Sequence, residues 1–370
     1  MRINVMNLLI LIVISVLFVA CTKIPTDEYS PLSMEMQSKF EAALDKVMLE
    51  NYIPGVIVGV WMGNEGSWIK AKGVSNLATN EPMRVDNHFR MASITKTFTG
   101  TIVLQLVDEG KIKLDSSLAY YLPQYKFRDA NKITVRYLGN MRSGIYSYSG
   151  DSALLAQLKA TNYSHTYPAD TLVKIALTHP SLFPAGQFYN YCNTNTILLG
   201  LICEKVTGKS IRELYNEKII IPNGLVNTYY PESTFLPEPY SHGYTDQTLN
   251  GEIQDATYFN PSWAGAAGIL ITDLYDLKKW IKLIVNGSLY SPAMHAERMK
   301  FVGNYGFAIA SGNDWVGHGG VIRGYTSNLY YHAGKDVTIV INVNSDINKP
   351  DSDVTPADAV FEAIAKVAVP

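Results

Sequence analysis

The sequence has little charge and few cysteines. Charged residues make up 17% of the chain, the formal net charge is −2, and only three cysteines occur. A protein whose main partner is nucleic acid normally presents a basic surface, so this charge balance argues against DNA or RNA. The chain also lacks internal repeats and low-complexity tracts, and 47% of its residues are hydrophobic. These features indicate a globular protein with a large core.

The sequence also lacks a hydrophobic run long enough for a transmembrane helix, and a shorter hydrophobic run lies near the N-terminus. Residues 8–20 are apolar, but so short a run is not expected to span a bilayer. It ends in Phe18-Val19-Ala20-Cys21, which resembles a bacterial lipobox. We therefore predict a lipoprotein-type signal peptide over residues 1–21, a lipid on Cys21, and a tether over residues 22–32. Plain secretion and an uncleaved anchor are the alternatives. The lipoprotein interpretation places the protein in the bacterial cell envelope, held to the membrane by its lipid.

The other two cysteines, Cys192 and Cys203, are not expected to form a disulfide. A helix is predicted to begin just after Cys192. At about 1.5 Å per residue, that helix would separate the two cysteines by roughly 15 Å, which is too far for a bridge. Both are predicted to be buried free thiols.

Strand patterns occur at both ends of the chain, and helical patterns lie between them. The periodicity predicts terminal helices over residues 34–51 and 356–368, and strands over residues 55–61, 68–74, 305–310, 321–331 and 337–343. This order predicts an α+β domain over residues 33–370. Its sheet would be built from about 33–92 and 301–370, and a mostly helical lobe over about 93–300 would be inserted between them. The cleft between sheet and lobe is the natural place for a site.

Two Ser-x-x-Lys patterns occur, and the expected secondary structure separates them. Ser67 opens a predicted strand, where residues three apart face opposite sides, so Ser67 and Lys70 could not meet. Ser93 opens a predicted apolar helix, where Ser93 and Lys96 lie one above the other. A lysine buried in this way becomes a better base, and the helix N-terminus favours a reactive serine. The alternative is a capping serine followed by a lysine that extends to solvent.

Two further patterns combine polar residues with turn signals. Tyr191-Cys192-Asn193 precedes a helical run, so Tyr191 could move a proton and Asn193 could bind a substrate carbonyl. The alternative is a packed tyrosine and a helix-capping asparagine. In His318-Gly319-Gly320, the missing side chains would let a strand edge pair with a peptide-like substrate, and His318 could polarise the site. The alternative is a glycine-rich turn with a surface histidine.

Together these segments resemble a known family, the serine β-lactamase-related hydrolases. The resemblance is carried by FRMASITKTF (residues 89–98), LQLVDEGKI (104–112), SGIY (143–146) and YCNTN (191–195), in the family order. Within this family, the sequence is similar in particular to class C β-lactamases and to Streptomyces-type D-alanyl-D-alanine carboxypeptidases. In these enzymes the serine of Ser-x-x-Lys is the nucleophile. The resemblance implies an antiparallel sheet flanked by helices, with an added helical lobe.

The resemblance also implies a mechanism. Ser93 would attack a carbonyl, Lys96 would accept its proton, and Tyr191 would relay protons to the leaving group. Backbone N–H groups of Ser93 and Val321 would form the oxyanion hole, each worth about 3 kcal/mol. Asn193 and Trp263 match positions that line the family's pocket. No metal and no organic cofactor is implied.

The substrate implied by the resemblance is a peptidoglycan stem peptide ending in D-Ala-D-Ala. An esterase, a peptidase for other D-amino acids, a β-lactamase, and a non-catalytic sensor of β-lactams or muropeptides are the alternatives. Two departures bear on this choice. Gly319 and Val321 stand where the carboxypeptidases usually carry threonine, and residues 305–315 contain no basic residue to hold a substrate carboxylate. We therefore predict that Arg323 folds back over the pocket to hold it. The alternative is a solvent-exposed arginine in a turn.

Overall fold

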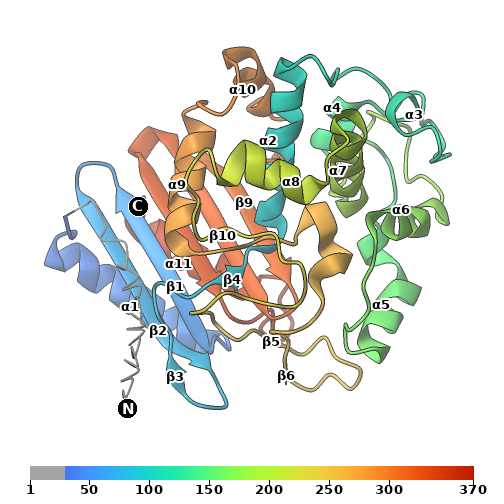
Figure 1. The fold of residues 1–370 in the computed structure, drawn as a ribbon. Helices are drawn as coiled ribbons and strands as arrows, with labels where there is room; N and C mark the ends of the chain where they lie inside the picture. Colours follow the sequence, from blue (N-terminus) through green and yellow to red (C-terminus); the bar gives the residue numbers. More distant parts are fainter. Residues whose placement is uncertain (1–29) are drawn as a thin grey trace, which may run out of the picture.

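A seven-stranded antiparallel sheet forms the centre of the protein. The computed structural model describes residues 30–370 (Figure 1). The predicted signal peptide, Cys21 and most of the predicted tether lie outside the described residues. All neighbouring strands of the sheet pair antiparallel, in the order β3 (Glu81–Pro82), β2 (Gly66–Asn76), β1 (Gly55–Met62), β11 (Val337–Val343), β10 (Tyr325–His332), β9 (Trp315–Ile322) and β8 (Ala310–Gly312). The sheet is therefore built from both ends of the chain, as predicted, and β1 pairs with β11 at its centre.

Two terminal helices cover one face of the sheet. They are α1 (Met34–Glu50) and α11 (Pro356–Ala368), which contact each other. Their apolar stripes pack on valine and isoleucine side chains of β1 and β11, which are buried along their whole length. The hydroxyls of Ser33 and Thr355 cap the two helices, which explains where each begins.

The other face of the sheet carries the helical part of the chain (Figure 1). Its α-helices are α2 (Thr95–Asp108), α3 (Leu118–Tyr121), α4 (Val135–Gly139), α5 (Ser152–Ala160), α6 (Ala169–Leu177), α7 (Asn193–Thr207), α8 (Ile211–Tyr215), α9 (Leu274–Val285) and α10 (Pro292–Arg298). Helix α9 packs directly on β10 and β11. None of the helices described over residues 30–370 is long and apolar enough to cross a membrane.

Short 3₁₀, π and strand segments lie between the main helices and strands. The helical segments are η1 (Ala92–Ile94), η2 (Tyr148–Gly150), η3 (Asn216–Ile220), η4 (Pro261–Ala267) and η5 (Ala333–Lys335). Two small sheets pair β4 (Phe89–Arg90) with β7 (Ile271–Thr272), and β5 (Tyr244–Thr245) with β6 (Gln254–Asp255). Strand β4 and the turn η1 lead directly into α2. The pairing of β4 with β7 holds this segment in place and so fixes the point at which α2 begins.

The C-terminal strands differ from the prediction in two respects. The predicted strand over residues 305–310 is wrong, since β8 begins only at Ala310. The predicted single strand over residues 321–331 is a hairpin, in which β9 ends at Ile322 and β10 begins at Tyr325. The glycines of β9 resemble a turn in sequence, yet they are strand residues that pack tightly against their neighbours. The actual turn is Arg323-Gly324, where Gly324 adopts a φ of +88°.

Candidate active site

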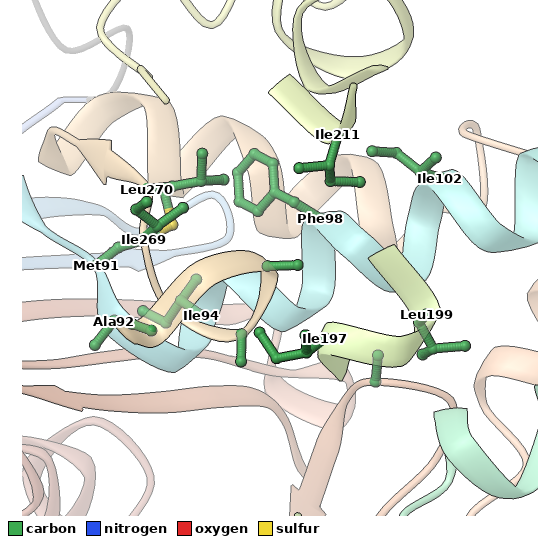
Figure 2. Close-up of a cluster of buried hydrophobic side chains, with 14 of the residues drawn as sticks. Met91, Ala92, Ile94, Phe98, Ile102, Ile197, Leu199, Ile211, Ile269 and Leu270 are labelled. Atoms are coloured by element: carbon green, nitrogen blue, oxygen red, sulfur yellow. The ribbon is translucent and has the colours of Figure 1, made fainter. Parts of the chain in front are cut away.

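Ser93, the predicted nucleophile, lies in the short turn just before α2, where the chain contacts β9 of the sheet. It belongs to the 3₁₀ turn η1, and α2 proper begins two residues later, at Thr95. The preceding Ala92 has a φ of +50°, an unusual conformation for a residue with a side chain, costing on the order of 1–3 kcal/mol. Hydrophobic packing around the segment enforces this bend, as Figure 2 shows for Ile94 against its buried neighbours.

The segment before Ser93 is also tied to β9 and β10. Met91 donates its N–H to Leu270 O at 3.0 Å, and its carbonyl accepts the Ser327 hydroxyl at 3.0 Å. Gly320 of β9 lies so close that an added Cβ would stand 2.5 Å from Met91 O. Only glycine therefore lets β9 approach the nucleophile turn at this point, which brings Ser93 next to the strand edge.

Lys96 lies one turn below Ser93 and is completely buried. Its Nζ is 2.9 Å from Ser93 Oγ and 2.8 Å from the carbonyl oxygen of Ala267. Burial lowers the pKa of Lys96 to about 7, which makes the neutral amine available near neutral pH. The neutral amine can donate to Ala267 O while its lone pair faces the Ser93 hydroxyl. The alternative of a lysine that extends to solvent is wrong, because the apolar neighbours of α2 enclose the side chain.

The second Ser-x-x-Lys pattern has no such geometry. Ser67 lies on β2, where it pairs with Trp61, and Lys70 forms an ion pair with Glu41 of α1 at 2.7 Å. The expected strand therefore exists, and its alternation separates the two side chains.

Tyr191 lies directly before α7 and faces Lys96 and the sheet. The Lys96 ammonium nitrogen is 4.9 Å from the centre of the Tyr191 ring, and the His318 ring is 6.0 Å away, centre to centre. Burial raises the pKa of the Tyr191 hydroxyl, while its hydrogen bond with Ser93 opposes this increase. Tyr191 therefore holds its proton at neutral pH and is within reach of the nucleophile.

Asn193 is the first residue of α7, but it does not cap that helix. Cys192 occupies the cap position and forms no side-chain cap bond. The Asn193 amide group instead donates from Nδ2 to Ser149 Oγ at 2.8 Å, and its backbone N–H donates to Ser147 Oγ at 3.0 Å. These bonds orient the side chain, which lines the same cavity as Ser93.

Both Cys192 and Cys203 are buried free thiols, as predicted.

His318 lies on β9, and the interpretation of a surface histidine in a turn is wrong. It is buried, its Nδ1 is 2.5 Å from Gly319 O, and its Nε2 is 3.0 Å from the Tyr305 hydroxyl. The carbonyl requires a proton on Nδ1, so Nε2 accepts from Tyr305. Burial and the nearby Lys96 lower the pKa of His318 to about 3. The ring is therefore neutral and held in one orientation.

Residues 318–322 of β9 form an open strand edge beside Ser93. Strand β8 pairs with β9 only as far as Gly317. A two-residue turn joins β9 to β10, so Ile322 and Tyr325 form the hydrogen-bonded pair next to the turn, and the N–H of Val321 points away from β10. The N–H of Val321 therefore faces the open edge, as an oxyanion-hole donor must, and the residue is 47% exposed.

A cavity of about 500 Å³ joins these groups. Its lining includes the predicted residues Ser93, Tyr191, Asn193, His318, Gly319, Gly320 and Val321. It also includes residues that sequence reasoning missed, chiefly Tyr189, Tyr305, Tyr330, Thr355 and Asp358. No local motif marks these five, and the C-terminal helix places Thr355 and Asp358 at the cavity. Among the described residues, no group of three or more His, Cys, Asp and Glu side chains could hold a metal ion.

Trp263 and Arg323 are not among the residues that line this cavity. Arg323 donates from Nε to the Tyr163 hydroxyl at 2.8 Å and pairs with Asp346 at 3.3 Å, and its guanidinium lies 5.9 Å from the centre of the Trp263 ring. Asp346 is nearly fully buried, so releasing Arg323 would leave an unpaired buried carboxylate. The prediction that Arg323 folds back over the pocket is therefore corrected. It is not a solvent-exposed arginine either, since its side chain is only 18% exposed.

Comparison with known proteins agrees with this geometry. The family model described as beta-lactamase matches residues 39–363. The chain belongs to the beta-lactamase family. It is also similar to the solved D-stereospecific amidohydrolase from Streptomyces sp., with 31% identity, a TM-score of 0.78, and coverage of 90% of this chain and 98% of that one. The predicted family and fold are therefore confirmed.

Two further proteins are similar to this chain. A D-aminopeptidase from Cereibacter sphaeroides is 28% identical over 306 residues, which are 79% of this chain and 57% of the relative. The chain thus spans less than two thirds of the length of this curated relative. The D-amino acid amidase from Ochrobactrum anthropi SV3, solved with L-phenylalanine, has a TM-score of 0.77 at 23% identity over 89% of this chain and 99% of that one, which shows the shared fold. The comparisons support a serine hydrolase.

Proposed function

We propose that the protein hydrolyses amide bonds that follow a D-amino acid residue, through an acyl-enzyme on Ser93. The observation that carries this proposal is the fully buried Lys96, whose Nζ is 2.9 Å from Ser93 Oγ and whose pKa burial lowers to about 7. A merely structural serine and lysine would not require a buried amine aimed at a hydroxyl in a cavity. The amidohydrolase and D-aminopeptidase relatives support D-aminoacyl amides or peptides as the substrate class.

The first half-reaction follows from these positions. Ser93 Oγ attacks the amide carbon while Lys96 accepts the hydroxyl proton. The oxygen of the tetrahedral intermediate accepts hydrogen bonds from the N–H groups of Ser93 and Val321. The carbon–nitrogen bond then breaks, Tyr191 gives its proton to the departing amine, and Lys96 returns a proton to Tyr191. The amine leaves, and an ester to Ser93 remains.

The second half-reaction reverses the proton path. A water molecule attacks the ester and forms the same oxyanion, and its proton passes to the neutral Lys96, either directly or through Tyr191, which takes the proton of the water as it gives its own to Lys96. The carbon–oxygen bond to Ser93 breaks, and Ser93 recovers a proton from Lys96. The neutral, fixed His318 does not exchange protons in this scheme, because its Nδ1–H is bound to Gly319 O and its Nε2 accepts from Tyr305. It supports the wall of the cavity against which Tyr191 packs.

The cavity gives less support to a carboxypeptidase for stem peptides ending in D-Ala-D-Ala. Such an enzyme needs a cation for the terminal carboxylate. No lysine or arginine belongs to the described lining of the Ser93 cavity, and Arg323 is engaged by Asp346. We therefore place the peptidoglycan stem peptide and β-lactams behind D-aminoacyl amides as substrates.

The test compares matched substrates on the purified protein. D-alanine amide, L-alanine amide, an acyl-D-Ala-D-Ala peptide, a chromogenic cephalosporin and a short neutral ester are incubated with wild type, Ser93→Ala and Ser67→Ala. Turnover of the D-amide well above that of the L-amide, lost in Ser93→Ala and kept in Ser67→Ala, supports the proposal. Preferred turnover of the D-Ala-D-Ala peptide would favour the carboxypeptidase, and a stable penicillin adduct without any turnover would favour a sensor.

We also propose that the protein is a lipoprotein of the bacterial cell envelope, anchored through Cys21. The support is the sequence Phe18-Val19-Ala20-Cys21 after the short apolar run over residues 8–20. In cells that express the full chain, wild type should partition with membranes, and Cys21→Ser should appear in the soluble fraction or remain unprocessed. A wild-type protein found wholly in the soluble fraction would contradict this proposal.

A further inference from the structure

One end of the cavity is formed by the beginning of α11, far from Ser93 in sequence. Asp358 lies in the first turn of this helix, and it lines the cavity together with Thr355, Tyr330 and Gly319. Asp358 is the only acidic residue of the described lining, which contains no lysine or arginine, and His318 there is held neutral. The formal charge that the cavity offers a substrate is therefore negative.

The hydrogen bonds of Asp358 leave it able to accept more. Asn328 Nδ2 donates to Oδ1 at 2.9 Å, and the Thr355 hydroxyl donates to Oδ2 at 2.7 Å. Each carboxylate oxygen has a second lone-pair direction, so two further donors can bind. The two existing bonds fix the orientation of the carboxylate, which reduces the entropy lost when a substrate binds.

The partner of this carboxylate, Asn328, is held rigidly in the protein interior. Asn328 is fully buried, and its Oδ1 lies only 2.8 Å from the position that a Cβ on Gly319 would occupy. Only glycine at position 319 therefore lets β9 lie this close to the amide that donates to Asp358. An ammonium group, with three donors and a positive charge, matches the free acceptor positions of the fixed carboxylate.

We propose that Asp358 binds the ammonium group of the substrate and thereby selects positively charged D-aminoacyl compounds. This inference rests on the proposed D-aminoacyl hydrolase function. The ammonium is either the free α-amino group of the D-amino acid or an amino group carried by the leaving group. A substrate with a free carboxylate at this end of the cavity is disfavoured by like charge. Asp358 is a binding residue for specificity and takes no part in proton transfer.

Two matched substrate pairs separate the possible sources of the ammonium. The first pair is D-alanine p-nitroanilide and D-lactic acid p-nitroanilide, which differ in an ammonium against a hydroxyl on the acyl side. The second pair is the 2-aminoethyl amide and the propyl amide of N-acetyl-D-alanine, which differ in an ammonium against a methyl on the leaving group. Each is measured as kcat/KM with wild type, Asp358→Asn and the control Glu362→Gln. Glu362 lies one turn further along α11, is exposed, and does not line the Ser93 cavity.

We expect wild type to prefer the ammonium member of one pair. A preference in the first pair shows that Asp358 binds the ammonium on the acyl side, and a preference in the second pair shows that it binds an ammonium on the leaving group. Asp358→Asn should lower kcat/KM for that member about 10- to 100-fold, the range for a hydrogen bond to a charged group. It should change the neutral members less than about twofold, because the amide keeps the bond from Asn328. Glu362→Gln should change none of the four.

A purely structural role for Asp358 would produce a different pattern. The Thr355 hydroxyl caps α11 by accepting from the Asp358 N–H, and it donates to the Asp358 carboxylate, so a cap weakened by the substitution would lower the melting temperature and reduce all four activities alike. Such equal losses, or an ammonium preference that persists in Asp358→Asn, would overturn the inference while leaving the proposed function intact. So would a wild type that cleaves the members of both pairs equally. Failure of wild type to cleave any D-aminoacyl substrate would instead refute the proposed function, and the inference with it.

Discussion

Replacing Lys96 with methionine should make the protein more stable and inactive. Lys96 is completely buried, and the surrounding protein lowers its pKa from 10.5 to about 7. In the unfolded chain the same side chain is charged and hydrated at pH 7. Folding therefore includes the cost of removing that proton or of burying the charge. Methionine has a similar length and carries no charge, so Lys96→Met abolishes this cost with little change in packing.

The size of the effect follows from the shift. A decrease from 10.5 to about 7 corresponds to about 5 kcal/mol of free energy of unfolding at pH 7 or below, at 1.36 kcal/mol for each pKa unit. Methionine also loses the hydrogen bonds of Nζ to Ser93 Oγ and Ala267 O, each worth about 1 kcal/mol. The net gain expected for Lys96→Met at neutral pH is therefore about 2–3 kcal/mol. The buried lysine would thus lower the stability of the protein while it provides the catalytic base, which is a trade-off between stability and activity.

The sign of this effect depends on pH in a defined way. Between about pH 7 and 10.5 the unfolded chain holds a proton that the folded chain has lost, so the stability of wild type rises with pH across this window. Below pH 7 the full cost applies, and above pH 10.5 it disappears. The advantage of Lys96→Met should therefore be greatest at or below pH 7 and shrink steadily toward pH 10.

Urea unfolding of both proteins at pH 7, 8.5 and 9.5 measures this difference. Lys174→Met serves as the control, because Lys174 is exposed and pairs with Asp170 on the surface of α6, where little stability is at stake. Two results would refute the reasoning. One is a Lys96→Met protein that is less stable than wild type at pH 7. The other is an advantage that stays constant as the pH rises.

Three further predictions concern the site itself. Ser93→Ala should abolish covalent labelling by a fluorescent penicillin in a mass measurement, whereas Ser67→Ala should keep it; labelling that survives in Ser93→Ala would place the nucleophile elsewhere. The kcat/KM of wild type for a neutral ester should rise with pH through about 7, because Lys96 must lose its proton to act as a base, and a profile flat from pH 5 to 9 would show another base. Gly320→Ala should lower the free energy of unfolding by about 1–3 kcal/mol and slow acylation, because its Cβ would stand 2.5 Å from Met91 O; an unchanged rate would show that this contact does not position the nucleophile.

The nucleophile could be predicted from the sequence because its geometry is local. Residues three apart meet on a helix and separate on a strand, and this difference alone distinguished Lys96 from Lys70. The fold was also accessible, since the strands at both chain ends show strong apolar patterns. The terminal helices, β1, β2 and β11 lie close to the predicted ranges for the same reason.

Other parts of the site depend on contacts between distant segments, which local patterns do not encode. From the sequence, the glycines of β9 allow either a strand edge or a turn, and the structure shows a strand in which they permit close packing against Met91 and Asn328. Arg323 was assigned to the cavity from its distance in sequence to Gly320. Its actual partner is Asp346, which lies beyond the next two strands, β10 and β11, and no residue near Arg323 in sequence indicates that pairing. Asp358 was missed because a helix 265 residues after Ser93 carries it to the cavity.

The electrostatics of the site connect its chemistry to its specificity. Burial lowers the pKa of Lys96 to about 7, keeps His318 uncharged and keeps the proton on Tyr191, so none of the three groups carries a permanent charge at neutral pH. The carboxylate of Asp358 then stands alone as the fixed charge that lines the described cavity. An incoming cation is attracted by this carboxylate and is not opposed by a fixed positive charge on the lining, whereas the carboxylate repels an anion. The burial that makes Lys96 a base thus leaves Asp358 to decide which substrates are favoured.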